Sequence, residues 1–243
     1  MGMFTVIPQD TFESMQLDAG VVLTSFDPAN PAAPDDSDIV CATTGGINVV
    51  CQPTYSDLGE DVDNVPNNMK ELKHLDGWDC SLAFTSLDTS AEGIRLALGA
   101  ADVTAASGKI VPRKDLSQDD FSDLWWVGDK ADGGIVAVKL KNALSTEGFS
   151  LQTTKNGKGQ TSCTLTGHVS IESQSVMPME FYSLEAPTVT YTAATLTSAG
   201  FKYGVTYYTR SGAGTTQNPY VYTPVEKNAT YNSGTTYYVK SYS

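Results

Sequence analysis

The alternation that decides the fold class lies in Trp78–Leu87, which reads WDCSLAFTSL. Every second residue in its first part is apolar: Trp78, Cys80, Leu82 and Phe84. This period of two is typical of a β-strand with one buried and one solvated face. The following TSAE at 89–92 has the form of a helix capping box. Apolar residues then recur at helical spacing: Ile94, Ala97, Leu98 and Ala101. We therefore predict a strand and then one helix packed through an apolar stripe.

Further strand patterns lie on both sides of this stretch: Leu17–Phe26, Ile47–Gln52, Ile135–Leu140, Leu151–Thr154 and Ser162–Ile171. The polar segment 109–123 ends in the apolar run Leu124–Val127. Lys139 and Lys141 alternate with apolar neighbours, so their strand should have one charged face. The last two strands are joined by residues 155–159, where Asn156-Gly157 favours a hairpin turn because both residues tolerate positive φ angles. The predicted fold class is mainly β, an antiparallel sandwich or barrel-forming fold with one flanking α-helix.

Two long segments lack a strand pattern. Residues 28–38 contain three prolines and three aspartates, which predicts an irregular loop or arm. Pro53–Asp76 has no β-branched run, and we expect a long loop whose role is interaction. Its candidate interaction residues are acidic: Asp57, Glu60, Asp61 and Asp63. Their spacing does not follow that of an EF-hand, so no metal site is expected.

The composition changes abruptly at Ala186. Residues 1–185 hold 27 of the 28 acidic residues but 11 of the 15 basic ones, a formal charge of −16. Residues 186–243 carry +3 and hold ten of the twelve tyrosines. We therefore predict two domains, an acidic β domain at 1–185 and a small Tyr-rich C-terminal β domain at 186–243. Such an acidic body disfavours nucleic acid as a ligand.

The C-terminal part contains an internal repeat. GVTYYTRS at 204–211 matches GTTYYVKS at 234–241, and a Tyr-Thr pair precedes each copy, at 191–192 and 222–223. Two copies are too few for a solenoid, so we expect two similar hairpin or strand units closing one small β domain. The repeat supplies a candidate surface: Tyr207, Tyr208, Tyr237 and Tyr238. Two interpretations remain open, cross-strand pairs that stabilise a thin sheet and an exposed binding face.

No residue pattern indicates catalysis. The four cysteines stand singly, without metal-binding spacing: Cys41, Cys51, Cys80 and Cys163. Only two histidines, His74 and His168, are present to complete a metal shell. Buried free thiols are the favoured interpretation, with one disulfide as the alternative. Phosphate-binding and nucleophile motifs are lacking, so we expect no enzyme and no cofactor. Residues 1–6 lack the basic and apolar stretches of a secretory signal, and no apolar run is long enough to span a bilayer.

Five short stretches occur in an order that resembles a known family: LDAGVVL at 17–23, FDP at 26–28, TTGGI at 43–47, GWD at 77–79 and CTLTGHV at 163–169. Together with the acidic loop at 57–66 and the capped helix, they resemble the major tail (tail tube) proteins of long-tailed bacteriophages, the siphoviruses. The resemblance covers about residues 15–185.

This resemblance implies a structural virion protein that self-assembles into hexameric rings stacked as a hollow tube. Inner strands of neighbouring subunits would join into one barrel, the 53–76 segment would contact the next ring, and the 28–38 arm would add ring contacts. The C-terminal domain would lie outside the tube. The implied partners are further copies of the chain and the other tail proteins, namely tape measure, tail terminator and distal tail proteins. The implied location is the virion, after assembly in the host cytoplasm.

The acidic charge fits a channel for DNA ejection. A wall that repels phosphate lets the duplex pass without specific binding, whereas Lys and Arg contacts would hold it. The alternative is that the carboxylates are ordinary solvated surface charge. A second function class is a bacterial surface-binding, adhesin-like module whose C-terminal domain binds carbohydrate.

Overall fold

A computed structural model describes residues 9–186, 189–194, 201, 205–226 and 229–242. Residues 1–6, for which no secretory signal is expected, and Gly204 of the first repeat lie outside the described residues. The chain divides into two compact units, and the boundary falls after Ala186. The larger unit consists of Met1–Pro28 and Ala33–Ala186, and the smaller unit contains Pro187–Ser243.

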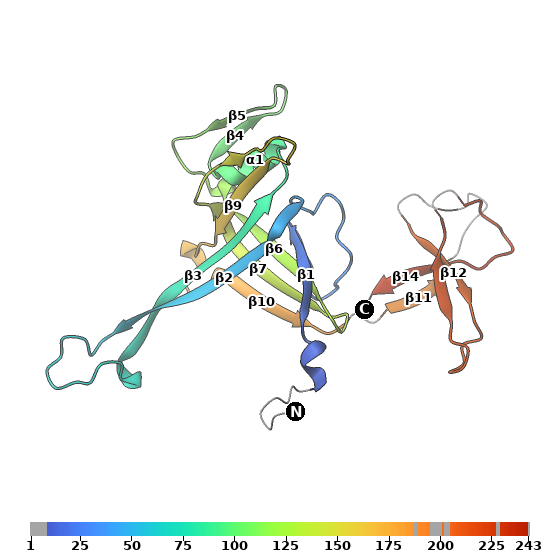
Figure 1. Cartoon of the computed structure of the whole chain (residues 1–243), viewed down its shortest axis with the longest axis horizontal. Coiled ribbons are helices and arrows are strands. Elements are labelled where there is room, and N and C mark those ends of the chain that lie inside the picture. The colour runs from blue at the N-terminus through green and yellow to red at the C-terminus, as the bar shows by residue number, and fades with distance from the viewer. Residues whose placement is uncertain (1–8, 187–188, 195–200, 202–204, 227–228, 243) are drawn as a thin grey trace. The chain divides into compact units, whose positions relative to one another are not determined.

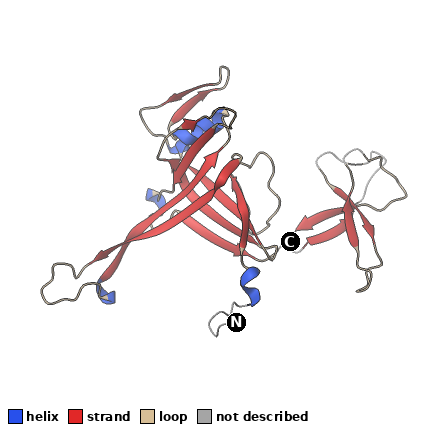
Figure 2. Cartoon of the chain, viewed as in Figure 1, coloured by secondary structure: helices blue, strands red, loops and turns tan. Residues whose placement is uncertain are grey.

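The larger unit is built around an eight-stranded antiparallel sheet (Figures 1 and 2). Its main path runs β1-β6-β7-β9-β3-β2, while β10 pairs with β7 and β8 pairs with β9. The strands are β1 Gln16–Leu23, β2 Thr43–Asp57, β3 Lys73–Ser86, β6 Ser122–Lys130, β7 Ile135–Ser145, β8 Leu151–Gln152, β9 Gln160–Thr166 and β10 Met179–Leu184. A separate hairpin pairs β4 Ala101–Thr104 with β5 Lys109–Pro112. The predicted mainly β, antiparallel class is confirmed.

The main core forms where β7 changes partners. Residues 135–140 of β7 lie between β6 and β10, and its end pairs with β9 through Leu144 and Ser145. This switch wraps the sheet around one apolar interior, which draws buried residues from six strands and the helix: Val22, Leu82, Phe84, Ala97, Leu124, Val138, Leu140, Leu165 and Met179. A smaller cluster on the other face of the sheet groups Leu23, Trp125 and Ala137.

One α-helix, α1 Ala91–Leu98, follows β3 as predicted. Its N-cap is Ser90, whose hydroxyl accepts from the amide of Gly93 at 3.1 Å, so the helix begins one residue later than the TSAE pattern indicates. Ala97 is buried in the main core, and its carbonyl accepts from the Ser145 hydroxyl at 2.7 Å. Ala101 belongs to β4 and does not continue the helix. Short 3-10 turns complete the helical content: η1 Gln9–Phe12, η2 Lys70–Leu72, η3 Gln118–Asp120 and η4 Ile171–Ser173.

The expectation of a loop throughout Pro53–Asp76 is wrong. β2 and β3 remain paired from Thr43↔Ser86 as far as Asp57↔Lys73, so only residues 58–72 connect the strands. The side chains of this acidic segment show no strand pattern. Its two ends are strands because the backbones of β2 and β3 pair with each other. A turn at Asn156-Gly157 between β8 and β9 is present, and Asn156 has φ 63°, but Gly157 does not adopt the positive φ that was also expected of it.

The smaller unit is a four-stranded antiparallel sheet in the order β11-β14-β12-β13. Its strands are β11 Val189–Ala193, β12 Tyr207–Ser211, β13 Val221–Pro224 and β14 Tyr238–Tyr242. The two sequence repeats supply β12 and β14, which pair with each other at the centre through Tyr208↔Tyr238. Each preceding Tyr-Thr strand then pairs with the second strand of the other repeat. The two repeats are therefore interlocked, and neither forms a hairpin of its own.

Candidate assembly surfaces

The β2–β3 hairpin projects from the larger unit as a two-stranded ribbon. β3 pairs with β9 only between Ser81 and Ser86, whereas its pairing with β2 continues for eight more residues toward the tip. Figure 1 shows this ribbon, in blue and cyan, extending well past the remaining strands of the sheet. We call the part formed by residues 52–79 the ribbon. Because the ribbon is long, its surface lies away from the core that the other strands enclose.

Large apolar side chains are exposed along the ribbon: Tyr55, Leu58, Val62, Met69, Leu75 and Trp78. Tyr55 and Leu75 are opposite each other in the ladder, so they present one apolar patch across both strands. Leu58 at the tip is 63% exposed. Contiguous exposed apolar side chains are typical of surfaces that contact another protein.

The acidic residues of the ribbon have two different roles. The carboxylate of Asp57 accepts from the amides of Asn68 at 2.8 Å and Gly59 at 3.0 Å, and these bonds lower the pKa of Asp57. Asp57 therefore organises the tip. Glu60, Asp61 and Asp63 are exposed beyond it, on a turn in which Asp61 adopts φ 65°. Of the four predicted interaction residues, these three are placed where a partner can reach them.

A second surface is the outer edge of β10. Among the described residues this strand has β7 as its only neighbour. The amide of Lys141 in β7 donates to the carbonyl of Pro178 at 2.7 Å. Because hydrogen-bonded and open pairs alternate in an antiparallel ladder, the backbone groups of Met179, Phe181 and Ser183 point away from β7. We call this row of outward backbone groups the β10 edge.

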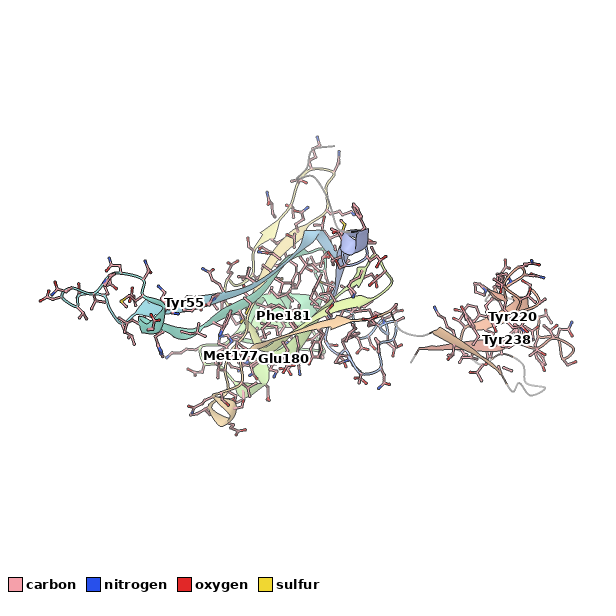
Figure 3. All side chains as sticks on the ribbon, turned by 90° about the horizontal axis from the view of Figure 1, so that it is seen from below. Tyr55, Met177, Glu180, Phe181, Tyr220 and Tyr238 are labelled. Carbon is pink, nitrogen blue, oxygen red and sulfur yellow. The ribbon has the colours of Figure 1, made fainter. Side chains whose placement is uncertain are left out.

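Apolar side chains accompany the β10 edge. Phe181, in the middle of the strand, is 60% exposed, and Val176 and Met177 just before the strand are also exposed. Figure 3 shows Met177, just before the strand, near Glu180 and Phe181 within it. The edge of β1, in contrast, is covered at Val22–Thr24 by backbone bonds from residues 38–40. An exposed apolar edge strand readily pairs with another chain.

Charges on β7 and its neighbours are paired. Lys139 Nζ lies 2.7 Å from a carboxylate oxygen of Asp123, and Lys141 forms an ion pair with Glu180. Burial would raise the pKa of Asp123, but hydrogen bonds from Lys139 and the Asn142 amide outweigh it and lower the pKa. The hydrogen bond from Lys141 likewise lowers the pKa of Glu180. The charged strand face predicted from Lys139 and Lys141 is present, with its positive charge locally neutralised.

The tyrosines of the smaller unit correct the prediction of a repeat surface. Tyr207, Tyr237 and Tyr238 are 5%, 6% and 7% exposed, and Tyr208 is half-buried. Three of the four are therefore buried. Alternation along a strand places neighbouring tyrosines on opposite faces of the sheet, and aromatic rings cover both faces. Tyr207 and Tyr237 pack with Phe201. Tyr220, which the repeat did not identify, is 46% exposed.

The other face carries an aromatic cluster with approximate two-fold symmetry. The Tyr191 and Tyr222 rings stack with centroids 3.7 Å apart and planes 2° from parallel. Each of them meets a repeat tyrosine edge-on at 5.2 Å, Tyr191 with Tyr208 and Tyr222 with Tyr238. Tyr208 and Tyr238 are 30 residues apart and Tyr191 and Tyr222 are 31 apart, so each contact in one repeat has a counterpart in the other. The cluster therefore follows from interlocking.

Arg210 packs against this aromatic face. Its guanidinium lies 4.2 Å from the ring centre of Tyr220 and 4.8 Å from that of Tyr238, and a hydrogen bond with Tyr222 raises its pKa. Figure 3 shows Tyr220 and Tyr238 close together in the smaller unit. These cation–π contacts stabilise the sheet.

Comparison with known proteins adds no identification. No family model matches the chain, and a search of curated proteins finds no similar sequence. Within the part of the chain that the structure describes, no helix has the length and apolar character to cross a membrane. The same residues contain no group of three or more potential metal ligands.

Proposed function

We propose that this chain is the self-assembling subunit of a phage tail tube, with its larger unit forming stacked rings around a DNA channel. The resemblance of residues 15–185 to tail tube proteins suggests this function. The observation that carries the proposal is the ribbon, which extends an exposed apolar surface beyond the core. A subunit that polymerises needs such a surface to contact the next ring.

The β10 edge supplies the second contact that a closed ring requires. Rings arise from heterologous contacts, in which one surface of a subunit meets a different surface of its neighbour. An edge strand can join a neighbour's strand through backbone hydrogen bonds and so continue a sheet across the subunit boundary. In the proposal, the β10 edge connects subunits within a ring and the ribbon connects successive rings.

The charge distribution favours passage of DNA over binding. Residues 1–185 carry a formal charge of −16, and the lysines of β7 are neutralised by Asp123 and Glu180. Counterion release, which drives DNA binding, requires lysines or arginines that reach the phosphates. A channel built from this unit would therefore repel the duplex over about a Debye length, near 8 Å at physiological salt.

Removing the smaller unit tests the proposal against the adhesin-like alternative. A chain ending at Ala186 retains both assembly surfaces, so tubes should form in electron micrographs while any glycan binding by the full-length chain is lost. If the truncated chain stays folded but monomeric where the full-length chain assembles, the assignment of assembly to the larger unit is wrong. Glycan binding by a full-length chain that never assembles would favour the adhesin-like function.

A further inference from the structure

Two thiols face each other at the base of the ribbon. Cys51 in β2 and Cys80 in β3 are directly opposite in the ladder, with their Sγ atoms 3.4 Å apart. Both are free cysteines. Cys80 is 2% exposed and Cys51 is half-buried, so Cys51 is the more accessible of the two.

The ladder position of this pair suits a disulfide. The amide of Gly167 donates to the carbonyl of Cys80 at 2.9 Å, so the backbone groups of Cys80 point toward β9 and away from β2. Cys51 and Cys80 therefore form an open, non-hydrogen-bonded pair, in which the Cα atoms are about 4.5 Å apart. This separation lies within the range of about 4.4–6.8 Å that disulfides span.

The pair also marks the point where the ribbon loses its support. From Ser81 onward β3 has neighbours on both sides, β2 and β9, whereas within the described part of the chain residues 73–79 pair with β2 alone. A two-stranded hairpin is only marginally stable by itself in water. A covalent link between Cys51 and Cys80 would close the chain around the whole ribbon and restrict its unfolded conformations.

We propose that Cys51 and Cys80 are a reversible redox site that is oxidised to a disulfide by a low-molecular-weight disulfide and then staples the base of the ribbon. Cys51, as its thiolate, attacks one sulfur of the small disulfide, which forms a mixed disulfide and releases one small thiolate. Cys80 then loses its proton and attacks the Cys51 sulfur, which displaces the second small thiolate. Two protein thiols are oxidised, one small disulfide is reduced to two thiols, and the two protons pass to the released thiolates.

The local environment sets the rate of this exchange. Burial and the adjacent Cys51 thiol raise the pKa of Cys80 to about 12, so little of the Cys80 thiolate is present at neutral pH. Because the thiolate is the attacking species, closure of the mixed disulfide should be slow at neutral pH and accelerate as the pH rises. The site is thus reduced wherever thiols are maintained and closes slowly in oxidising surroundings. This inference does not depend on the proposed tube function.

Peptide mapping of the full-length chain tests the proposal. The protein is incubated with oxidised glutathione at about pH 8.5, near the ordinary thiol pKa, then unfolded, alkylated and digested without reduction. We expect the Cys51 and Cys80 peptides to be linked and Cys41 and Cys163 to be alkylated. Four alkylated cysteines, or a link between any other pair, would overturn the proposal.

Hydrogen exchange and two serine variants check the effect on the ribbon. Oxidation should slow amide exchange in residues 52–57 and 73–79 by roughly tenfold or more, as expected for a link that closes a loop of this length. Cys51→Ser should abolish both the link and the added protection, while the matched Cys41→Ser variant keeps both. Equal protection on oxidation of Cys51→Ser would show that another site is responsible.

Discussion

The indole nitrogen of Trp126 in β6 donates to the carbonyl oxygen of Ala19 in β1 at 2.9 Å. This bond spans an irregularity in β1, where the pairing with β6 shifts between Leu17 and Val21. Gly20, at φ +68°, allows the backbone to bend against the indole. A Cβ at this position would overlap the Val127 carbonyl oxygen and would lie 2.7 Å from the Trp126 nitrogen.

Gly20→Ala should therefore destabilise the larger unit by about 2–4 kcal/mol, since both the positive φ and the close contacts disfavour a side chain. Urea unfolding of the full-length chain, followed through tryptophan fluorescence, measures this change. Gly46→Ala is the matched control, because Gly46 has φ +87° but no atom lies within 4 Å of the place that its Cβ would occupy. Equal losses at the two positions would mean that the contact with Trp126 has no structural role.

The β10 edge can be blocked without disturbing the ladder to β7. The amide of Ser183 points outward, so Ser183→Pro removes a donor that β7 does not use. We expect the variant to keep its circular dichroism spectrum and to lose association in sedimentation velocity experiments. Ser183→Ala, which keeps the outward amide, should assemble like the unmodified chain. Normal assembly of Ser183→Pro would exclude the β10 edge as an interface.

The sequence predicts a strand where burial of one of its faces produces an alternation of apolar and polar side chains. Cys80, Leu82 and Phe84 alternate with small or polar residues because one face of β3 enters the core, and this strand and the following helix were predicted. The expectation that Trp78 shares this buried face is wrong, because β3 has left the core there and Trp78 is exposed on the ribbon. Residues 53–57 and 73–76 are also strands, but both faces of the ribbon meet solvent and no alternation reveals them. The sequence also does not show which backbone groups of β10 point outward, because the direction of the hydrogen bonds depends on the partner strand.

The candidate residues of the smaller unit show a second limit. The repeat correctly indicated that Tyr208 and Tyr238 are related, and they pair at the centre of the sheet. It could not indicate burial, because the rings of Tyr191 and Tyr222, which come from the two edge strands β11 and β13, stack on each other and pack against Tyr208 and Tyr238. The exposed Tyr220 lies outside the repeated motif and gave no signal.

Tyr191 and Tyr222 should be coupled in stability. Each single substitution to alanine should destabilise the smaller unit, by similar amounts because the two rings occupy equivalent positions. In a double-mutant cycle on the full-length chain, the interaction free energy should be about 0.5–1.5 kcal/mol, as for other aromatic pairs. Hydrogen exchange of residues 205–226 supplies the local free energies. Additive effects would show that the stacked rings do not interact.

The Lys141–Glu180 pair should contribute stability only where Glu180 is ionised. Its folded-state pKa is lowered by Lys141, so the contribution is present above the unfolded value and lost as the pH falls through the lowered folded value. Because Glu180 is partly exposed, Glu180→Gln should cost about 0.2–1 kcal/mol at pH 7. That cost should shrink as the pH falls below about 4.3.

Urea titrations between neutral and acidic pH measure this difference. Glu172→Gln, at an exposed carboxylate, serves as the control and should leave the unfolding free energy unchanged. A cost for Glu180→Gln that is constant with pH would contradict an ionic contribution.

Electron microscopy of the purified full-length chain over a range of concentrations tests the proposed tube directly. We predict rings and stacked tubes for the unmodified chain. Leu58→Asp, which places a charge on the exposed ribbon tip, should leave the chain folded and stop stacking beyond single rings. Monomers of the unmodified chain under every assembly condition, with or without tail partner proteins, would contradict the proposed function.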